Sequence, residues 1–247
     1  MQDLGRFLLV LALICAGSHG RGSLIINGQL APEGYLQFMV SIQNRNGHVC
    51  GGFLISEDIV VTAAHCDIDL THVILEGHNL KNRNVKIIGI SGKCKHNNYE
   101  EVGRGYDIML LRLARRVSIG NNIKTIPLAE INMNLEDNQV CYVAGWGKTE
   151  NSNYSVDDLR VVDVSVINDE VCRFYWDEDL PDNVICAGGF NTNKGFCQGD
   201  SGGPLVCNGK AVGIVSFNSY YNCKYPDRPN VYTDIRGYLP WMLTCLI

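Results

Sequence analysis

Three residues whose side chains could act together in nucleophilic chemistry lie far apart in the sequence. His65 follows an apolar run in the segment TAAHC, Asp107 heads the apolar run DIMLL, and Ser201 stands among glycines in GDSGGP. A serine hydroxyl is a weak nucleophile unless a base accepts its proton and a third group orients that base. Because a histidine, an aspartate and a serine supply these three parts, the segments predict a site in which Ser201 attacks a substrate.

The glycines around Ser201 add a second chemical feature. They allow a sharp turn that brings backbone amide groups close to a substrate carbonyl. Amide donors in that position stabilise the negative charge that develops on the oxygen of a tetrahedral intermediate. Each segment taken alone has an ordinary alternative, namely a structural histidine, an aspartate that caps a turn, or a glycine turn without catalysis.

Short strands must position these residues, because the chain after Ile25 consists mainly of β-type runs broken by turns. Runs that are rich in β-branched residues or alternate in polarity include residues 38–42, 59–62, 85–91, 108–113, 140–145, 159–166, 211–217 and 230–234. Helix signals are limited to residues 169–174 and the tail 238–247, and residues 114–128 could connect two halves. The pattern predicts an all-β barrel or sandwich.

The motifs together resemble the chymotrypsin/trypsin family of serine proteases, over essentially the whole chain from Ile25 to the C-terminus. The phrase CGGFLISED, which begins at Cys50 and precedes TAAHC, most resembles the granzyme and mast-cell protease branch. The resemblance implies two six-stranded antiparallel β-barrels with a C-terminal helix and the site between them. The peptidase domain would span residues 25–247, with the first barrel over about 25–128 and the second over about 129–247.

The resemblance also implies a role for each residue of the site. Ser201 would attack a peptide carbonyl, His65 would act as general base and then acid, and Asp107 would orient and stabilise the imidazolium. The amides of Gly199 and Ser201 would form the oxyanion hole. Proteins or peptides would be hydrolysed through an acyl-enzyme, without a cofactor or metal ion. The alternative is a weak or inactive binding protein of the same fold, but such relatives typically lack a triad member, and this chain retains all three.

Several features predict a secreted glycoprotein. Residues 1–20 combine Arg6, an apolar run and small residues, as secretory signal peptides do. The apolar run is shorter than the roughly 20 residues that span a bilayer, so we expect an extracellular or secretory-granule protein without a membrane partner. Asn153 begins the glycosylation sequon NYS. The net charge of −5 argues against nucleic acid as a partner.

The residues before Ile25 predict synthesis as a zymogen. Residues 21–24 would form a short propeptide, or residues 23–24 alone if the signal peptide ends later. Ile25 resembles the mature N-terminus of the family, whose released amine pairs with the aspartate that matches Asp200. Because Leu24 precedes the cleavage site, the activating peptidase is not expected to be trypsin-like.

The cysteines predict disulfides rather than a zinc site. Ten of the eleven cysteines follow the predicted signal peptide, and none of them forms a CxxC pair. The family resemblance implies the pairs Cys50–Cys66, Cys141–Cys207, Cys172–Cys186 and Cys197–Cys223. Cys94 and Cys245 are left over, and they could pair with each other or one could bridge to another chain.

The resemblance identifies residues around the pocket for the side chain that precedes the cut bond. They are Gly195, Phe196, Gln198, Ser216, Phe217, Asn218 and Asn230. Gly195 stands where an aspartate would select basic side chains, while Asn218 and Asn230 replace glycines of the pocket walls. We therefore expect cleavage after small or medium uncharged residues such as Ala, Val, Leu or Met. Ser216 to Asn218 would pair with the substrate backbone.

Three further expectations concern the surface. Arg104 could reach neighbouring substrate subsites, but a solvated loop arginine is the favoured interpretation. Residues 77–84 contain no carboxylate, which argues against a calcium site in that loop. Besides substrates and an activating peptidase, protease inhibitors are expected partners of a monomeric enzyme.

Overall fold

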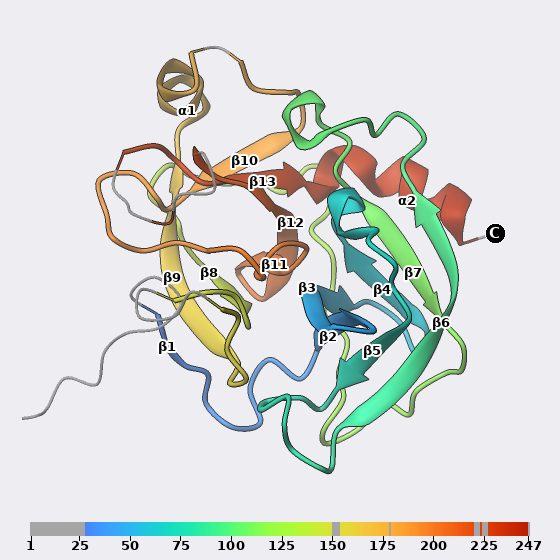
Figure 1. The fold of residues 1–247 in the computed structure, drawn as a ribbon. Coiled ribbons are helices and arrows are strands. Elements are labelled where there is room, and N and C mark those ends of the chain that lie inside the picture. Colours follow the sequence, from blue (N-terminus) through green and yellow to red (C-terminus); the bar gives the residue numbers. More distant parts are fainter. Residues whose placement is uncertain (1–27, 150–153, 178, 220–222, 224–226, 247) are drawn as a thin grey trace, which may run out of the picture.

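The computed structural model describes residues 28–149, 154–177, 179–219, 223 and 227–246. Apart from the short strand near residue 29, its strands form two groups, one from the first half of the chain and one from the second (Figure 1). The predicted signal peptide, the propeptide, Ile25 and the glycosylation site Asn153 lie outside the described residues.

The first group is a closed antiparallel barrel with the strand order β2–β3–β4–β7–β6–β5. The strands are β2 (Met39–Asn44), β3 (Gly47–Leu54), β4 (Ile59–Thr62), β5 (His72–Leu75), β6 (Lys86–Lys95) and β7 (Met109–Leu113). The barrel closes because β2 pairs with β3 along one edge and with β5 along the other. Buried apolar side chains such as Val40, Leu54, Leu75 and Leu111 fill its interior, and their burial is the main favourable term in folding.

The second group contains β8 (Val140–Gly145), β9 (Arg160–Ile167), β10 (Val184–Ala187), β11 (Pro204–Cys207), β12 (Lys210–Phe217) and β13 (Val231–Asp234). β8 pairs with both β9 and β11 and thereby closes a second antiparallel barrel, while β1 (Gln29–Leu30) pairs with the beginning of β9. Along β9, Val162 and Val164 are buried and Asp163 and Ser165 are exposed, as expected for a strand with one face on a core. The predicted fold of two six-stranded barrels is confirmed.

Helical elements are short. They are η1 (Ala64–Cys66), η2 (Val102–Arg104), α1 (Asp169–Tyr175), η4 (Ile235–Tyr238) and α2 (Leu239–Cys245). The side chain of Asn168 caps α1 by accepting hydrogen bonds from the amides of Glu170 and Val171. The C-terminal helix α2 lies against the first barrel although it follows the second (Figure 1). Within the described residues, no helix has the length and apolar composition to cross a membrane.

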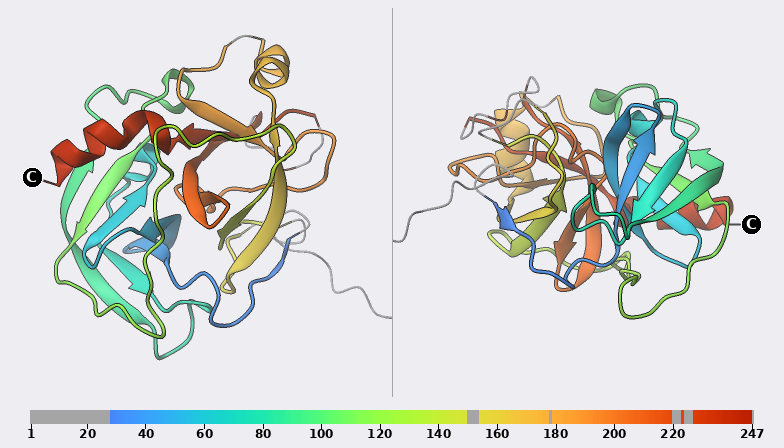
Figure 2. Two further views of the ribbon diagram at one scale, coloured as in Figure 1. Left: turned by 180° about the vertical axis from the view of Figure 1, so that it is seen from behind. Right: turned by 60° about the horizontal axis from the view of Figure 1, so that its bottom comes forward.

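A hydrophobic cluster fills the seam between the two barrels. It joins Phe53 and Val61 of the first barrel to Val206 and Ile214 of the second, and α2 contributes Met242. Residues 114–139 connect the barrels across the back of the molecule (Figure 2). Because the cluster fixes the barrels relative to each other, side chains from different barrels can be held at constant distances along the seam.

Five disulfides brace this arrangement. They are Cys50–Cys66, Cys94–Cys245, Cys141–Cys207, Cys172–Cys186 and Cys197–Cys223. Four of them join the pairs that the family resemblance implies. For the remaining two cysteines, the structure pairs Cys94 with Cys245, which links β6 to the last residue of α2.

Candidate active site

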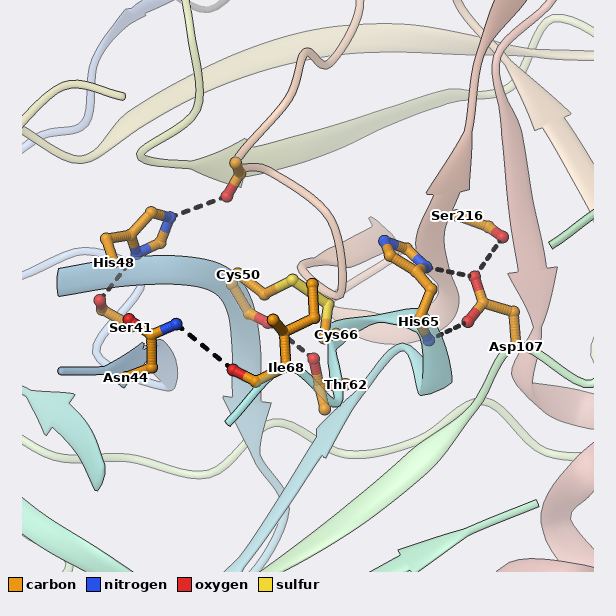
Figure 3. Close-up of a disulfide and its surroundings, with 12 residues drawn as sticks. Ser41, Asn44, His48, Cys50, Thr62, His65, Cys66, Ile68, Asp107 and Ser216 are labelled. Atoms are coloured by element: carbon orange, nitrogen blue, oxygen red, sulfur yellow. Dashed lines mark hydrogen bonds and ion pairs between the residues drawn. A yellow bond between two sulfur atoms is a disulfide. The ribbon is translucent and has the colours of Figure 1, made fainter. Parts of the chain in front are cut away.

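His65 is held just beyond the end of β4 by contacts on both sides. β4 ends at Thr62, whose hydroxyl donates to the carbonyl oxygen of Gly51 at 2.9 Å. The disulfide between Cys50 and Cys66 ties the following turn, η1, back to β3 (Figure 3). These constraints leave the backbone of His65 little freedom, so the imidazole is presented from a fixed position.

His65 and Asp107 form a two-point contact. Nδ1 of His65 lies 2.7 Å from Oδ2 of Asp107, and the backbone N–H of His65 donates to Oδ1 at 2.9 Å (Figure 3). The Asp107 side chain is 1% exposed, whereas that of His65 is 22% exposed. A carboxylate only accepts hydrogen bonds, so Nδ1 carries the proton and Nε2 of the neutral ring is the nitrogen that can act as a base.

Two residues of the second barrel complete the surroundings of Asp107. The hydroxyl of Ser216 in β12 donates to Oδ2 at 2.5 Å, and the hydroxyl of Thr233 in β13 donates to the backbone carbonyl at 2.9 Å. Burial by itself raises the pKa of Asp107, but the charge and hydrogen bonds of His65, together with the Ser216 hydroxyl, outweigh it and hold the pKa below its ordinary value. Asp107 is therefore ionised at neutral pH.

Ser201 lies in a turn of the second barrel that packs against the first barrel. Its carbonyl oxygen accepts a hydrogen bond from the amide of Gly51 in β3 at 2.8 Å. Gly202 follows with φ +78°, and a Cβ atom there would come within 2.1 Å of Thr62 Oγ1 and 2.5 Å of the Gly51 oxygen. Only glycine permits this close approach, which brings the Ser201 segment to the strand that leads to His65.

A hydrogen-bonded chain from the first barrel holds Gly199. Nε2 of His48 lies 2.8 Å from the carbonyl oxygen of Gly199, so Nε2 carries the proton. Nδ1 then accepts from the hydroxyl of Ser41 at 2.8 Å, and Ser41 accepts from the side-chain amide of Gln43 at 3.1 Å (Figure 3 shows His48 and Ser41). Burial lowers the pKa of His48 despite its bond to Gly199, which keeps the ring neutral. In the described part of the chain, the amides of Gly199 and Ser201 donate no hydrogen bond.

Asp200 is fully buried beside Ser201. Its Oδ1 accepts from the amide of Gly147 at 2.7 Å and its Oδ2 from the amide of Cys197 at 2.9 Å. Burial raises the pKa of Asp200 from 3.8 to about 7, against the opposing effect of these two amides. No cationic partner of Asp200 occurs among the residues that the structure describes. The pairing with the amine of Ile25 remains a prediction, because Ile25 lies outside that part.

Two of the residues assigned to the primary pocket contact the disulfide Cys197–Cys223: the side-chain oxygen of Gln198 lies 3.3 Å from Cys197 Sγ, and the side-chain nitrogen of Asn218 lies 3.7 Å from Cys223 Sγ. Phe196 is 3% exposed and packs edge-on against Tyr232, with ring centroids 5.2 Å apart. Asn230 is fully buried against Gly189, where a Cβ atom would come within 2.5 Å of Asn230 Oδ1. The remaining members range from buried to half-buried: Gly195, Gln198, Ser216, Phe217 and Asn218.

Two other sequence features have plain structural explanations. Arg104 is exposed and forms ion pairs with Glu100 and Glu101, as a solvated loop arginine does. Cys50, Cys66 and His65 are close enough to suggest a metal site. However, the two cysteines are joined in a disulfide and offer no thiolate, so this group does not suit a metal ion.

No sequence motif marks His48, Ser41 or Thr233, although His48 and Thr233 contact the candidate site and Ser41 supports His48. His48 and Gly199 are separated by 151 residues, and Thr233 and Asp107 by 126. No motif or periodicity marks such partners, because both contacts exist only once the barrels have docked.

Similarity to known proteins extends over almost the whole chain. The family model described as Trypsin matches residues 25–242. The chain is 36% identical to duodenase-1 of Bos taurus over 240 residues, which cover 95% of this chain and 94% of that protein. It is 36% identical to mast cell protease 3 of Ovis aries, covering 96% and 94% of the two chains, and 33% identical to granzyme B(G,H) of Mus musculus, covering 95% and 96%.

Proposed function

Because the chain belongs to the trypsin family of serine endopeptidases, we propose that it hydrolyses peptide bonds with Ser201 as nucleophile, His65 as general base and acid, and Asp107 as the orienting carboxylate. The observation that carries this proposal is the contact between Nδ1 of His65 and the buried carboxylate of Asp107 at 2.7 Å. It leaves Nε2 as the basic nitrogen of the ring. The docking of the Ser201 turn against β3 supports the same assignment.

The proposed reaction has two stages. Nε2 of His65 accepts the proton of the Ser201 hydroxyl as Oγ bonds to the substrate carbonyl carbon, and the amides of Gly199 and Ser201 stabilise the resulting oxyanion. The imidazolium then gives its proton to the leaving amine as the peptide C–N bond breaks. Water, deprotonated by the same nitrogen, attacks the acyl-enzyme and releases the acid product and the Ser201 hydroxyl. Asp107 stabilises the imidazolium in both stages.

We also propose a preference for small or medium uncharged side chains before the cut bond. Gly195 brings no carboxylate to the pocket, so a lysine or arginine side chain would be buried without a countercharge there. The amide side chain of Asn230 is buried nearby and reduces the available space. Cleavage profiling of the processed enzyme with a peptide library tests this preference, and efficient cleavage after Arg or Lys would contradict it.

Synthesis as a secreted zymogen belongs to the same proposal. Release of Ile25 by an activating peptidase would supply an amine to Asp200, whose carboxylate is fully buried. The processed protein would act as a monomer outside the cell or in secretory granules, glycosylated at Asn153 and subject to protease inhibitors. N-terminal sequencing of the secreted and the active forms tests both cleavage sites.

Covalent labelling tests the proposed nucleophile. A serine-directed fluorophosphonate probe is expected to label the processed enzyme, and Ser201→Ala is expected to abolish both labelling and peptide hydrolysis. Ser118→Ala provides a matched control, since it removes an exposed serine hydroxyl that lies outside both the candidate site and the glycosylation sequon. A processed, folded protein that neither reacts with the probe nor cleaves a diverse peptide library would instead be an inactive binding protein.

A further inference from the structure

The backbone around Asp107 adopts an unusual local conformation. The amide of Ile108 donates to the carbonyl oxygen of Tyr106 at 2.8 Å, which places Asp107 at the centre of a three-residue turn. Tyr106 itself has φ +58°, in the left-handed region that residues with a Cβ atom seldom adopt. Such a conformation persists only where surrounding contacts enforce it.

Two hydroxyl groups from the second barrel supply such contacts. The amide of Tyr106 donates to the hydroxyl oxygen of Tyr238 at 3.2 Å, and the hydroxyl of Thr233 donates to the carbonyl oxygen of Asp107 at 2.9 Å. Tyr238 ends η4, Thr233 belongs to β13, and both are 4% exposed. The two bonds therefore hold the backbone on either side of the Asp107 side chain.

Aromatic side chains also pack against the turn around Asp107, in addition to the two hydrogen bonds. The ring of His96 stacks on that of Tyr106 with centroids 4.7 Å apart. Tyr238 and Trp241 pack around His96 at centroid distances of 5.5 Å and 4.9 Å. The ring of Tyr238 thus supports Tyr106 through His96, while its hydroxyl accepts the hydrogen bond from the Tyr106 amide.

We propose that Tyr238 and Thr233 are positioning residues, which set the place of the Asp107 carboxylate from across the barrel seam. Asp107 is covalently part of the first barrel, but its side chain contacts Ser216 and its backbone contacts Thr233, both in the second. Through the Tyr106 amide, Tyr238 adds a further anchor. Through these anchors, the position of the second barrel determines the geometry between Asp107 and His65. Catalysis is sensitive to small displacements of reacting groups, so this geometry affects the rate. The inference rests on the proposed catalytic role of Asp107.

Single-atom changes in the processed full-length enzyme test the inference. Tyr238→Phe and Thr233→Val each remove one anchoring hydroxyl, and each is expected to lower kcat by about tenfold, with KM changed less than about twofold. Thr233→Ser retains the hydroxyl and is expected to recover most of the rate lost in Thr233→Val. Tyr142→Phe is the matched control, because Tyr142 packs in the same seam cluster as Tyr238 but forms no hydrogen bond with Tyr106 or Asp107.

The pH dependence of kcat/KM separates positioning from a merely structural role. A displaced Asp107 stabilises the His65 imidazolium less, so the acidic limb of the profile should move to lower pH in Tyr238→Phe and Thr233→Val, but not in Tyr142→Phe. Wild-type kcat and an unmoved limb in both anchor variants would overturn the inference, provided that Asp107→Ala is strongly impaired. Full activity of Asp107→Ala would instead overturn the proposed function on which the inference rests.

Discussion

At the scale of single residues, the candidate site depends on buried polar groups that fix one another's proton positions. Asp107 determines that Nδ1 of His65 is protonated, and the carbonyl of Gly199 does the same for Nε2 of His48. In each pair an acceptor that cannot donate settles the tautomer of a ring. Removing one member therefore changes the hydrogen bonding of its neighbour as well as its own.

His48→Phe tests this dependence at the predicted oxyanion hole. The variant leaves the carbonyl oxygen of Gly199 without its donor, so the Gly199 segment should lose its fixed orientation. We expect kcat to fall by about tenfold or more, with a smaller change in KM, because the lost contact acts mainly in the transition state. Steady-state kinetics with active-site titration measures both quantities.

Ser41→Ala is the control for that prediction. It removes the partner of His48 Nδ1 but keeps the bond between Nε2 and Gly199, so its loss in kcat should be smaller. Equal activity of His48→Phe and the wild type would show that Gly199 does not need this support.

The sequence predicted the residues with distinctive chemistry but not those that support them. His65, Asp107 and Ser201 stand in recognisable segments, and the structure brings His65 and Asp107 into contact. His48, Thr233 and Tyr238 act through single hydrogen bonds across the seam, and their surroundings in the sequence are ordinary strand or turn residues. Such roles follow from the docking of the barrels, which local patterns do not encode.

At the scale of elements, the turn between Gly199 and β11 packs against the first barrel. Gly202 in this turn packs its backbone against Thr62 at the end of β4 and against Gly51 in β3. The same two residues support His65, because the Thr62 hydroxyl bonds to the Gly51 carbonyl. A distortion at Gly202 would therefore displace Ser201 and His65 together.

Gly202→Ala should be strongly destabilising for this reason. The new Cβ atom would have to adopt φ +78° and would approach the backbone oxygen of Gly51 to 2.5 Å. Adding the left-handed penalty to the strain of overpacking gives an expected loss of about 2–5 kcal/mol in the free energy of unfolding. Urea denaturation of the processed enzyme, inactivated by Ser201→Ala, measures the loss.

Gly209→Ala isolates the conformational part of that loss. Gly209 has φ +75°, but a Cβ atom there would meet nothing within 4 Å. We expect it to lower the free energy of unfolding by only about 1 kcal/mol. If both variants were equally stable, the close contact at Gly202 would have no energetic importance.

At the scale of the whole molecule, Asp200 links the folded structure to the predicted N-terminal cleavage, because its buried carboxylate is the predicted partner of the amine that cleavage releases. The carboxylate is enclosed by backbone of the second barrel, with the amides of Gly147 and Cys197 as its donors. Strand patterns predicted only an all-β barrel or sandwich, and the two-barrel fold followed from the family resemblance of the segments around His65, Asp107 and Ser201. The pairing of Asp200 with Ile25 stays a prediction, because it depends on a chain end that cleavage must create.

The uncleaved chain should therefore lose stability as the pH rises. The folded-state pKa of Asp200 is raised to about 7 from 3.8, so between these values the folded chain binds more protons than the unfolded chain does. Stability contributed by this proton is present below about pH 4 and is lost as the pH rises through about 7, with a total change on the order of 4 kcal/mol. Urea denaturation of the uncleaved Ser201→Ala chain at several pH values measures this change in the free energy of unfolding.

The same series on the Ser201→Ala chain that also carries Asp200→Asn accounts for the other titrating groups. A difference in the free energy of unfolding between the two chains that did not vary with pH would contradict the prediction. After cleavage at Ile25, pairing with the new amine should favour the charged carboxylate, so the loss on raising the pH should disappear.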